Sequence, residues 1–193
     1  MSGHDPDTTL LMRERMEDAF PLVHMSLAQD NAQPHSHDFV ELVYVTGGTG
    51  THIHGTQRYP VFAGDCFTVL PGQRHGYTQR RDLHITNILF YPELLQAQAA
   101  DLQTLPGFSR FFALEPLFRR ETSFAHKLHL SAAQQRTMTS LCTQLSRELS
   151  SRHPGYKSLC TGLLMQIVVF VSRSFDSSLH ATHADTEFDS KRT

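Results

Sequence analysis

The chain has 193 residues, enough for one ordinary domain with a full core and a helical appendage. Its hydrophobic share of 39% and its charged share of 19% are typical of a soluble globular protein. Lys and Arg total 17 against 19 Asp and Glu, and the formal net charge of -2 argues against a broad cationic surface for nucleic acid.

The cysteines and the apolar stretches exclude further classes. Cys66, Cys142 and Cys160 are odd in number and lack Cys-x-x-Cys spacing, which argues against a disulfide framework or a zinc knuckle and favours buried thiols. The most apolar window, Leu163 to Val171, is about half the length of a membrane span, and no signal-peptide core precedes it. We therefore expect a cytoplasmic protein with no membrane partner.

Residues 1–22 are predicted to form an N-terminal arm. Within it, Thr9 to Phe20 has the amphipathic character of a short helix. Pro21 to Leu27 is predicted to be the first strand, and a polar loop follows it.

The stretch from Pro34 to Gly48, PHSHDFVELVYVTGG, organises the rest of the chain. His35, His37 and Glu41 share one parity, so in an extended strand they point to the same face. The residues between and after them are aromatic, aliphatic or β-branched and predict a strand buried on both sides. The glycine-rich segment Thr46 to Gly50 predicts a hairpin turn after this strand.

Further short strands are predicted up to Phe90, separated by turns rich in Gly and Pro. Their spacing indicates an antiparallel sandwich or small barrel, whose closure would bring the first strand close to His75. His75 and Tyr77 share a parity, so both should face inward together. The expected strands are Arg58–Phe62, Cys66–Leu70, His75–Thr78 and Leu83–Phe90.

Helices are predicted after Tyr91. A first helix should start at Pro92 and end before Pro106-Gly107, and the aromatic segment 108–118 should be irregular. A short strand is expected in 124–130.

Two longer helices form the last predicted unit, residues 131–178. Ser131 looks like the N-cap of a helix that runs to about Arg152, and a second helix should run from about Tyr156 to Phe175. The second helix carries apolar residues on more than one face, so this αα-hairpin is predicted to form a homodimer interface; the alternative is that its stripe is only core against the barrel. Residues 179–193 are polar and patternless and are predicted to be a linker.

The two central segments resemble the motifs of the cupin superfamily. His35, His37, Glu41 and Gly48 keep the spacing of the first motif, and Gly64, Gly72 and His75 keep that of the second. The departures are the leading Gly of the first motif, which would fall at Gln29, and in the second motif the Pro, displaced to Pro71, and the Asn, which would fall at Gln79. In metal-binding cupins these positions form a site of three histidines and one carboxylate, here His35, His37, Glu41 and His75.

The whole pattern of a barrel, a helix pair and a polar linker is similar to the sensor half of AraC-family transcriptional regulators, over roughly residues 20 to 178. The stretches HSHDFVELVYV, GDCFTVLPGQRH and ITNILFYPELL resemble the rhamnose operon regulators in particular. The resemblance implies a mainly β fold with α: a cupin-type antiparallel β-barrel (double-stranded β-helix) over 23–130, followed by an antiparallel helix pair. It also implies a small effector, such as a sugar, and DNA binding through a C-terminal domain that is absent after Thr193.

Two functional hypotheses remain open. In the first, the chain is a regulatory sensor and no enzyme, and His35, His37, Glu41, His75 and Tyr77 bind the effector. In the second, the same two motifs hold a divalent metal such as Zn, Ni, Mn or Fe for a dioxygenase or isomerase reaction. The alternative to a metal is that the four polar side chains hydrogen-bond one another or a sugar hydroxyl. For Tyr77, the alternative to an effector contact is a barrel residue whose hydroxyl finds a partner.

Overall fold

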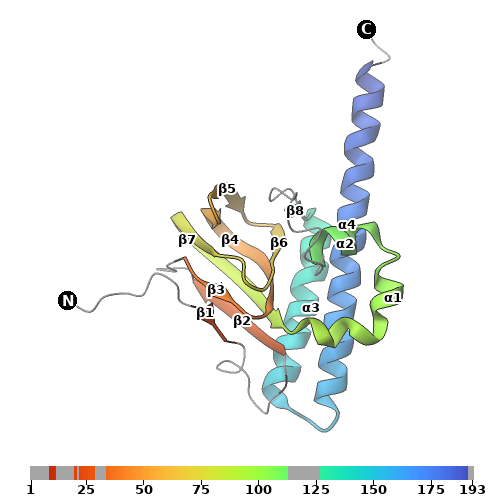
Figure 1. Ribbon diagram of the computed structural model, residues 1–193. Coiled ribbons are helices and arrows are strands. Elements are labelled where there is room, and N and C mark those ends of the chain that lie inside the picture. Colours follow the sequence, from red (N-terminus) through yellow and green to blue (C-terminus); the bar gives the residue numbers. More distant parts are fainter. Residues whose placement is uncertain (1–8, 12–19, 21, 29–33, 113–126, 191–193) are drawn as a thin grey trace, which may run out of the picture.

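A computed structural model describes residues 9–11, 20, 22–28, 34–112 and 127–190 of the chain (Figure 1). The predicted helix in residues 9–20 falls mostly outside this part. The strands are β1 (Thr9–Leu10), β2 (Leu22–Ala28), β3 (Ser36–His37), β4 (Val40–His54), β5 (Gln57–Phe62), β6 (Asp65–Val69), β7 (His75–Phe90) and β8 (Leu128–His129). The helices are the 3₁₀ helix η2 (Pro92–Gln98), α1 (Ala99–Leu102), α2 (Pro106–Phe112), α3 (Ala132–Ser151) and α4 (Tyr156–Ser190).

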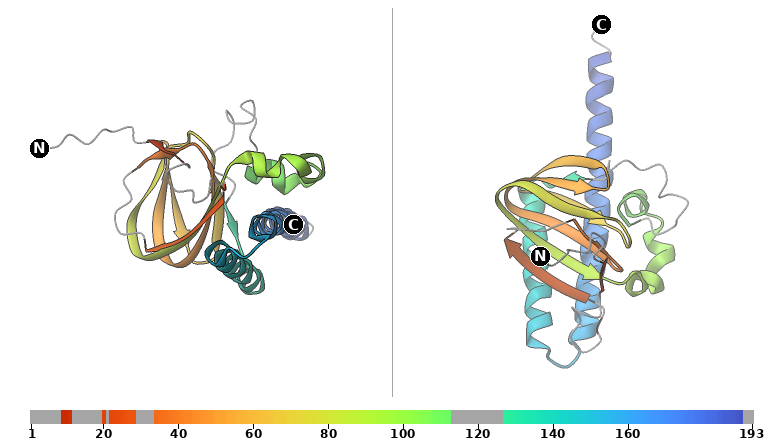
Figure 2. Two further views of the ribbon diagram at one scale, coloured as in Figure 1. Left: turned by 90° about the horizontal axis from the view of Figure 1, so that it is seen from below. Right: turned by 60° about the vertical axis from the view of Figure 1, so that its left-hand side comes forward.

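The long strands β4 and β7 pair with each other at the centre of an antiparallel barrel. The strand order is β2-β7-β4-β6-β8, and β5 pairs with the distal half of β4. Seen end-on, the sheet curls around an interior, and α3 and α4 lie together outside it (Figure 2, left). The predicted fold class, mainly β with α and an antiparallel barrel followed by a helix pair, is therefore confirmed.

Alternation along the strands divides the apolar residues into two cores. Even-numbered residues near the start of β4 and the end of β7, such as Leu42 and Ile88, pack into one cluster with α2, α3 and α4. The opposite face lines the barrel interior with a second cluster: Val43, Val45, Val61, Phe67, Val69, Tyr77, Leu83 and Ile85. The strands are buried on both sides, as predicted for β4, and the interior face carries the predicted site.

The glycine segment of β4 is not a hairpin turn, so this prediction was wrong. β4 continues through it to His54, and three register shifts against β7 fall between Val45 and Thr51. Gly48 has φ +68°, and a Cβ there would lie 1.9 Å from the carbonyl oxygen of Asp82. Glycines here allow a bulged, bent strand, because only glycine combines this φ with such a close backbone contact. The chain turns at Gly55-Thr56 instead, after the second half of β4.

The region after β7 also differs from prediction. Residues 92–98 form a 3₁₀ helix, and Pro106-Gly107 opens α2 rather than ending a helix. Proline is tolerated in the first helical turn because its missing N–H would have no partner there. Gly107 brings α2 against α4, since a Cβ would lie 2.2 Å from the carbonyl oxygen of Ser172. Phe111 of α2 then meets Phe175 of α4 edge to face at 5.2 Å.

The helix pair begins as predicted and ends later than predicted. Ser131 caps α3 in a capping box, because its hydroxyl accepts from the N–H of Gln134 while the Gln134 side chain accepts from the N–H of Ser131. The short strand expected in 124–130 is β8. The second helix does not end near Phe175: α4 continues to Ser190 and projects beyond the body (Figure 1). The role of 179–193 as a linker stays a prediction.

The segment Tyr156–Phe175 of α4 is long and apolar enough, by composition alone, to cross a membrane, with a mean hydropathy of 1.5 over the window. Half of that window is buried inside the protein. Leu164, Ile167 and Val168 are fully buried within the cluster that α4 shares with α2, α3 and the sheet. A core helix passes the same test of length and hydropathy, so the composition of this segment is weak evidence for a span.

Candidate effector and metal site

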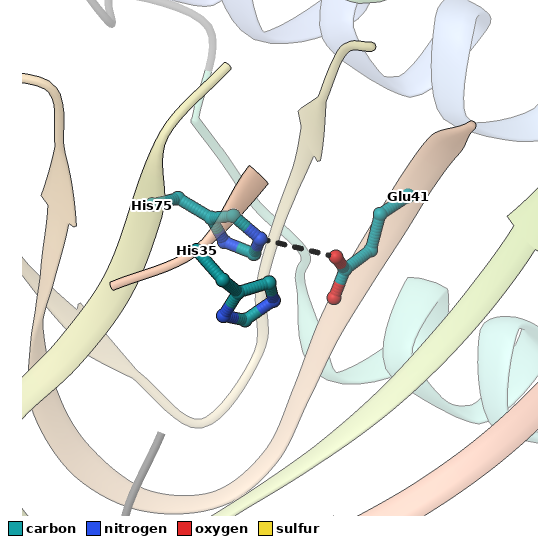
Figure 3. Close-up of side chains that lie close together, drawn as sticks. All are labelled: His35, Glu41 and His75. Atoms are coloured by element: carbon teal, nitrogen blue, oxygen red, sulfur yellow. Dashed lines mark ion pairs between the residues drawn. The ribbon is translucent and has the colours of Figure 1, made fainter. Parts of the chain in front are cut away.

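The two predicted motifs meet at the start of β7. His35 and His75 form an isolated antiparallel bridge, in which each backbone N–H donates to the other residue's carbonyl at 2.9 and 2.8 Å. Glu41 follows on β4, and its carboxylate reaches toward both rings (Figure 3). His35 and His37 do not share one continuous strand with Glu41, since residues 38 and 39 bend between β3 and β4. The predicted convergence is nevertheless present.

Glu41 is the centre of the polar group. Its Oε2 lies 3.0 Å from His37 Nε2 and 3.4 Å from His75 Nε2. One ligand atom from each of His35, Glu41 and His75 fits within 4.8 Å of the others, a spacing that could hold a metal ion. His37, predicted as a fourth ligand, contacts the carboxylate but does not belong to this group of three. Glu41, His37 and His75 are buried, and His35 is half-buried.

The tautomer of His37 follows from its second contact. His37 Nδ1 lies 2.8 Å from the carbonyl oxygen of Phe39, and a carbonyl only accepts, so Nδ1 carries the proton. In the neutral ring Nε2 is then a bare lone pair that faces Glu41 Oε2, also an acceptor. Neither His37 Nε2 nor either ring nitrogen of His75 has a hydrogen-bond partner in the described chain. Metal-binding histidines are commonly oriented in this way, with the other ring nitrogen donating to a carbonyl.

The electrostatics of the site place an ionised carboxylate beside the neutral ring of His75. Burial opposes ionisation of Glu41, but His75 and His37 outweigh it and lower the pKa of Glu41 to about 2. Burial lowers the pKa of His75 to about 3, and Glu41 offsets only part of that shift. At neutral pH the carboxylate is therefore ionised and the His75 ring is neutral, which is the state that a cation requires of both.

Tyr77 faces inward with His75, as their parity predicted. It is 6% exposed, and its hydroxyl has no hydrogen-bond partner among the described residues. Burial and then Glu41 raise the pKa of Tyr77 well above its usual value, so the phenol stays protonated and can donate.

His52 is an interior residue that sequence reasoning missed. It is fully buried, and its ring lies 5.1 Å from Tyr77 and 5.7 Å from His75. Burial lowers the pKa of His52 well below its usual value. From Val45 to His52 is seven steps along β4, whereas their partners Ile85 and Tyr77 are eight steps apart on β7. The bulges thus reverse the parity of β4, and even-numbered His52 shares a face with odd-numbered Glu41.

Asn87 is a second residue that was missed. It lies on β7, is 6% exposed, and its Nδ2 donates to Glu41 Oε1. The sequence contained a signal for it: in the apolar run ITNILF, Asn87 is the only polar residue among those that share the parity of His75. The Asn of the second cupin motif would fall at Gln79, but Gln79 is exposed and accepts a hydrogen bond from Thr51. The amide beside the carboxylate therefore comes from a different position.

The sequence matches the family described as AraC-like ligand binding domain over residues 22–168. The chain belongs to this family. Among its relatives, the HTH-type transcriptional activator RhaR of Shigella dysenteriae serotype 1 is 31% identical over 163 residues, and that of Escherichia coli K12 is 30% identical over 163 residues. Each match covers 83% of this chain and 54% of the relative, so the chain spans about half the length of these proteins.

Solved structures with a similar fold include a cupin from Shewanella frigidimarina and an oxalate decarboxylase from Bacillus subtilis with Mn(II) centres. The cupin is 24% identical with a TM-score of 0.34 and covers 38% of this chain and 68% of its own. The decarboxylase is 15% identical with a TM-score of 0.33 and covers 38% of this chain and 22% of its own.

The AraC-like domain uses the acidic residue of its second motif for structure. Asp65, 1% exposed, accepts from the N–H of Phe62 at 2.9 Å and pairs with Lys127 and His129 at 2.8 and 2.9 Å. Because Lys127 and His129 flank Leu128 of β8, this carboxylate ties the barrel to the segment that enters α3. The five predicted site residues, in contrast, lie around the interior; their roles in binding an effector or a metal stay predictions.

Proposed function

We propose that this AraC-like domain senses a small-molecule effector inside the barrel and dimerises a transcriptional regulator through its helices. The single observation that carries the proposal is a polar cluster in a largely apolar interior: His37, Glu41, His75 and Tyr77 are buried, His35 beside them is half-buried, and His37 Nε2, both His75 ring nitrogens and the Tyr77 hydroxyl have no hydrogen-bond partner among the described residues. Buried polar atoms without partners are costly, so a protein retains them where a ligand satisfies them. The relatives are transcriptional activators by name, which supports a regulator rather than an enzyme.

The effector is expected to be a hydroxyl-rich molecule, because the site offers both hydrogen-bond acceptors and a hydrogen-bond donor. Glu41 accepts, the Tyr77 hydroxyl donates, and neutral ring nitrogens accept. A sugar matches this mixture, and the rhamnose-type relatives support it. Thermal unfolding should be measured with L-rhamnose, L-mannose, L-fucose and L-arabinose. We expect one sugar to raise Tm in the wild type and not in Tyr77→Phe or Glu41→Gln, while the exposed-site control Asp101→Asn responds normally. A response that both site variants retain would place binding elsewhere.

A divalent metal fits the same residues. His35, Glu41 and His75 would hold it, with His37 beside the carboxylate, and Zn, Ni, Mn and Fe accept this mixture of nitrogen and oxygen ligands. The 3.0 Å contact between His37 Nε2 and Glu41 Oε2 supports the fit, since a cation beside both atoms could use the lone pair of each. A bound metal would supply a Lewis-acidic centre for an effector oxygen. Elemental analysis of protein purified without an affinity tag should find about one equivalent of metal, and loss of it in His75→Ala.

A metal-dependent enzyme is the second candidate, favoured by the same His and Glu donor set. Such an enzyme would turn over a substrate in the isolated domain once metal is added. We expect no turnover of the sugar panel with added Mn²⁺, Fe²⁺, Ni²⁺ or Zn²⁺. Metal-dependent product formation that His75→Ala abolishes would favour the enzyme over the sensor.

The dimer surface that we propose is the outer face of α4. The stripes that pattern analysis favoured are largely core, since Leu145 is fully buried and Leu163 is 7% exposed. A groove of about 530 Å³ lies on a different face, next to the start of α3. It is lined by Gln134, Gly162, Met165, Gln166, Val169, Phe170, Arg173 and Ser174. The α4 members recur at helical spacings of three and four, which suits an antiparallel helix of a second copy.

Light scattering tests this surface. Val169→Glu should convert the dimer into a monomer with an unchanged circular dichroism spectrum, because the carboxylate would have to lose its hydration at the interface. Leu159→Glu is the matched control, since Leu159 lies on α4, is 50% exposed and is outside the groove. A dimer that tolerates Val169→Glu would reject this face.

We expect DNA to be bound by the part of such regulators that lies outside the matched residues. We also expect the protein to act in the cytoplasm. Helix α4, which leaves the body and extends to Ser190, would connect the two parts. An effector alters transcription only by preferring one arrangement of these parts over another.

A further inference from the structure

The side chain that holds the Glu41 carboxylate is a neutral amide. Asn87 stands opposite Val43 of β4 and Met25 of β2, so the sheet fixes its backbone on both sides. Glu41 lies two residues before Val43 on the same face of β4, within reach of the amide. Asn87 Nδ2 donates to Glu41 Oε1, whereas Oε2 faces His37 and His75. The two oxygens of one carboxylate thus have separate surroundings.

The orientation of the amide follows from chemistry. An ionised carboxylate only accepts hydrogen bonds, so the Asn87 atom that contacts Glu41 must be Nδ2. Its Oδ1 is then left as an acceptor, and it is buried without a hydrogen-bond partner in the described parts of the chain. An amide with a purely structural role would normally have both ends satisfied.

We propose that Asn87 is a positioning residue of the site: it fixes Glu41 Oε1 so that Oε2 is presented to the histidines as a cation ligand. The inference rests on the proposed function of the cluster as a cation and effector site. A neutral donor is suited to this task, because it restrains the carboxylate without neutralising it. An Arg or Lys in the same place would cancel the charge that a divalent cation needs.

The contact itself is tested in metal-free protein with a double-mutant cycle. Tm is measured in EDTA for Glu41→Leu, Asn87→Leu and the double variant. Each single change strands a buried polar partner, so the Tm loss of the double variant should be clearly smaller than the sum of the two single losses. Additive losses would overturn the proposal. If Asn87→Leu does not fold, Asn87→Thr replaces it in the same cycle.

Cobalt binding tests the positioning role with a readout that packing alone does not move. Co²⁺ gives visible d–d absorption bands that report its ligands, and a supporting residue of this kind should cost about 10- to 100-fold in metal affinity. We expect that loss, with altered bands, in Asn87→Leu and Asn87→Asp. The matched control is Thr86→Val, the next residue on β7, which loses the 3.2 Å contact of its hydroxyl with Ser26. It should bind Co²⁺ within about twofold of the wild type.

The outcomes separate the two proposals. Full Co²⁺ affinity and unchanged bands in both Asn87 variants would overturn the positioning role while leaving the metal site intact. A wild type that binds no Co²⁺ would reject the metal in the proposed function, and the double-mutant cycle alone would then decide whether Asn87 fixes the carboxylate.

Discussion

Replacing Asp65 by Asn should weaken the joint between the barrel and the helix pair. The carboxylate is buried and accepts three hydrogen bonds, from Phe62 N–H at 2.9 Å, Lys127 Nζ at 2.8 Å and His129 Nδ1 at 2.9 Å. Asn keeps the size and one oxygen but removes the charge. The bond to Phe62 can persist, whereas the two contacts with basic side chains become neutral or are lost.

The magnitude follows from the exposure of the partners. Hydrogen bonds to charged groups contribute about 1.5–3 kcal/mol and neutral ones about 0.5–1.5 kcal/mol, so weakening two bonds costs about 1–1.5 kcal/mol each, or about 2–3 kcal/mol together. The side chains of Lys127 and His129 are 27% and 61% exposed, so water replaces part of each contact. We therefore expect a loss of about 2 kcal/mol in the free energy of unfolding, or about 4–8 °C in Tm for a domain of this size.

Urea unfolding followed by circular dichroism measures this loss. Asp101→Asn is the control, because Asp101 is exposed, and its change should stay within about 0.5 kcal/mol. Lys127→Met adds a second check: its effect should shrink when Asp65 is already Asn, because the shared contact is gone. An Asp65→Asn loss no larger than that of Asp101→Asn would refute the structural role given to this carboxylate.

Three further outcomes follow from packing and burial. Gly48→Ala should destabilise by several kcal/mol and Gly55→Ala by only about 1 kcal/mol, because both have positive φ but only a Cβ at Gly48 meets backbone, and equal losses in urea unfolding would contradict this. Gly107→Ala should lower Tm by separating α2 from Ser172 of α4, and an unchanged Tm would reject the close approach. Burial raises the pKa of Cys142 to about 12 and, with a contribution from Glu148, that of Cys160 to about 11; it also raises the pKa of Cys66. Thiolate is therefore scarce at pH 8, and all three cysteines should react with Ellman's reagent only on unfolding. Rapid labelling of the native protein would count against their burial.

Local sequence determined much of the fold. The N-cap at Ser131, the start of α4 near Tyr156 and the parity of His75 with Tyr77 depend on neighbours within a few residues, and each is present as expected. The convergence of His35, Glu41 and His75 was also foreseeable, because motif spacing fixes their strands and antiparallel closure brings those strands together.

Features that depend on distant contacts were not foreseeable in this way. The start of α2 at Pro106 depends on the close fit of Gly107 against α4, and the apolar stripes of the helix pair pack in the cluster between the helices and the outer face of the sheet. Leu145 and Leu163 are core residues, so we place the proposed dimer interface on the face that carries Val169 and Phe170. The apolar periodicity of a helix predicts which of its faces is buried, but not which element of the fold packs against that face.

The sequence by itself determined which residue types could bind a ligand and which of them lie on strands. Only the tertiary structure decided that His52 lies beside them and that the Asn87 amide contacts Glu41. Alternation in a strand is a local rule that holds until a bulge breaks it, and the bulges at Gly47 to Gly50 exist because of backbone contacts with the distant strand β7. The face on which His52 lies is therefore set by the pairing of two strands.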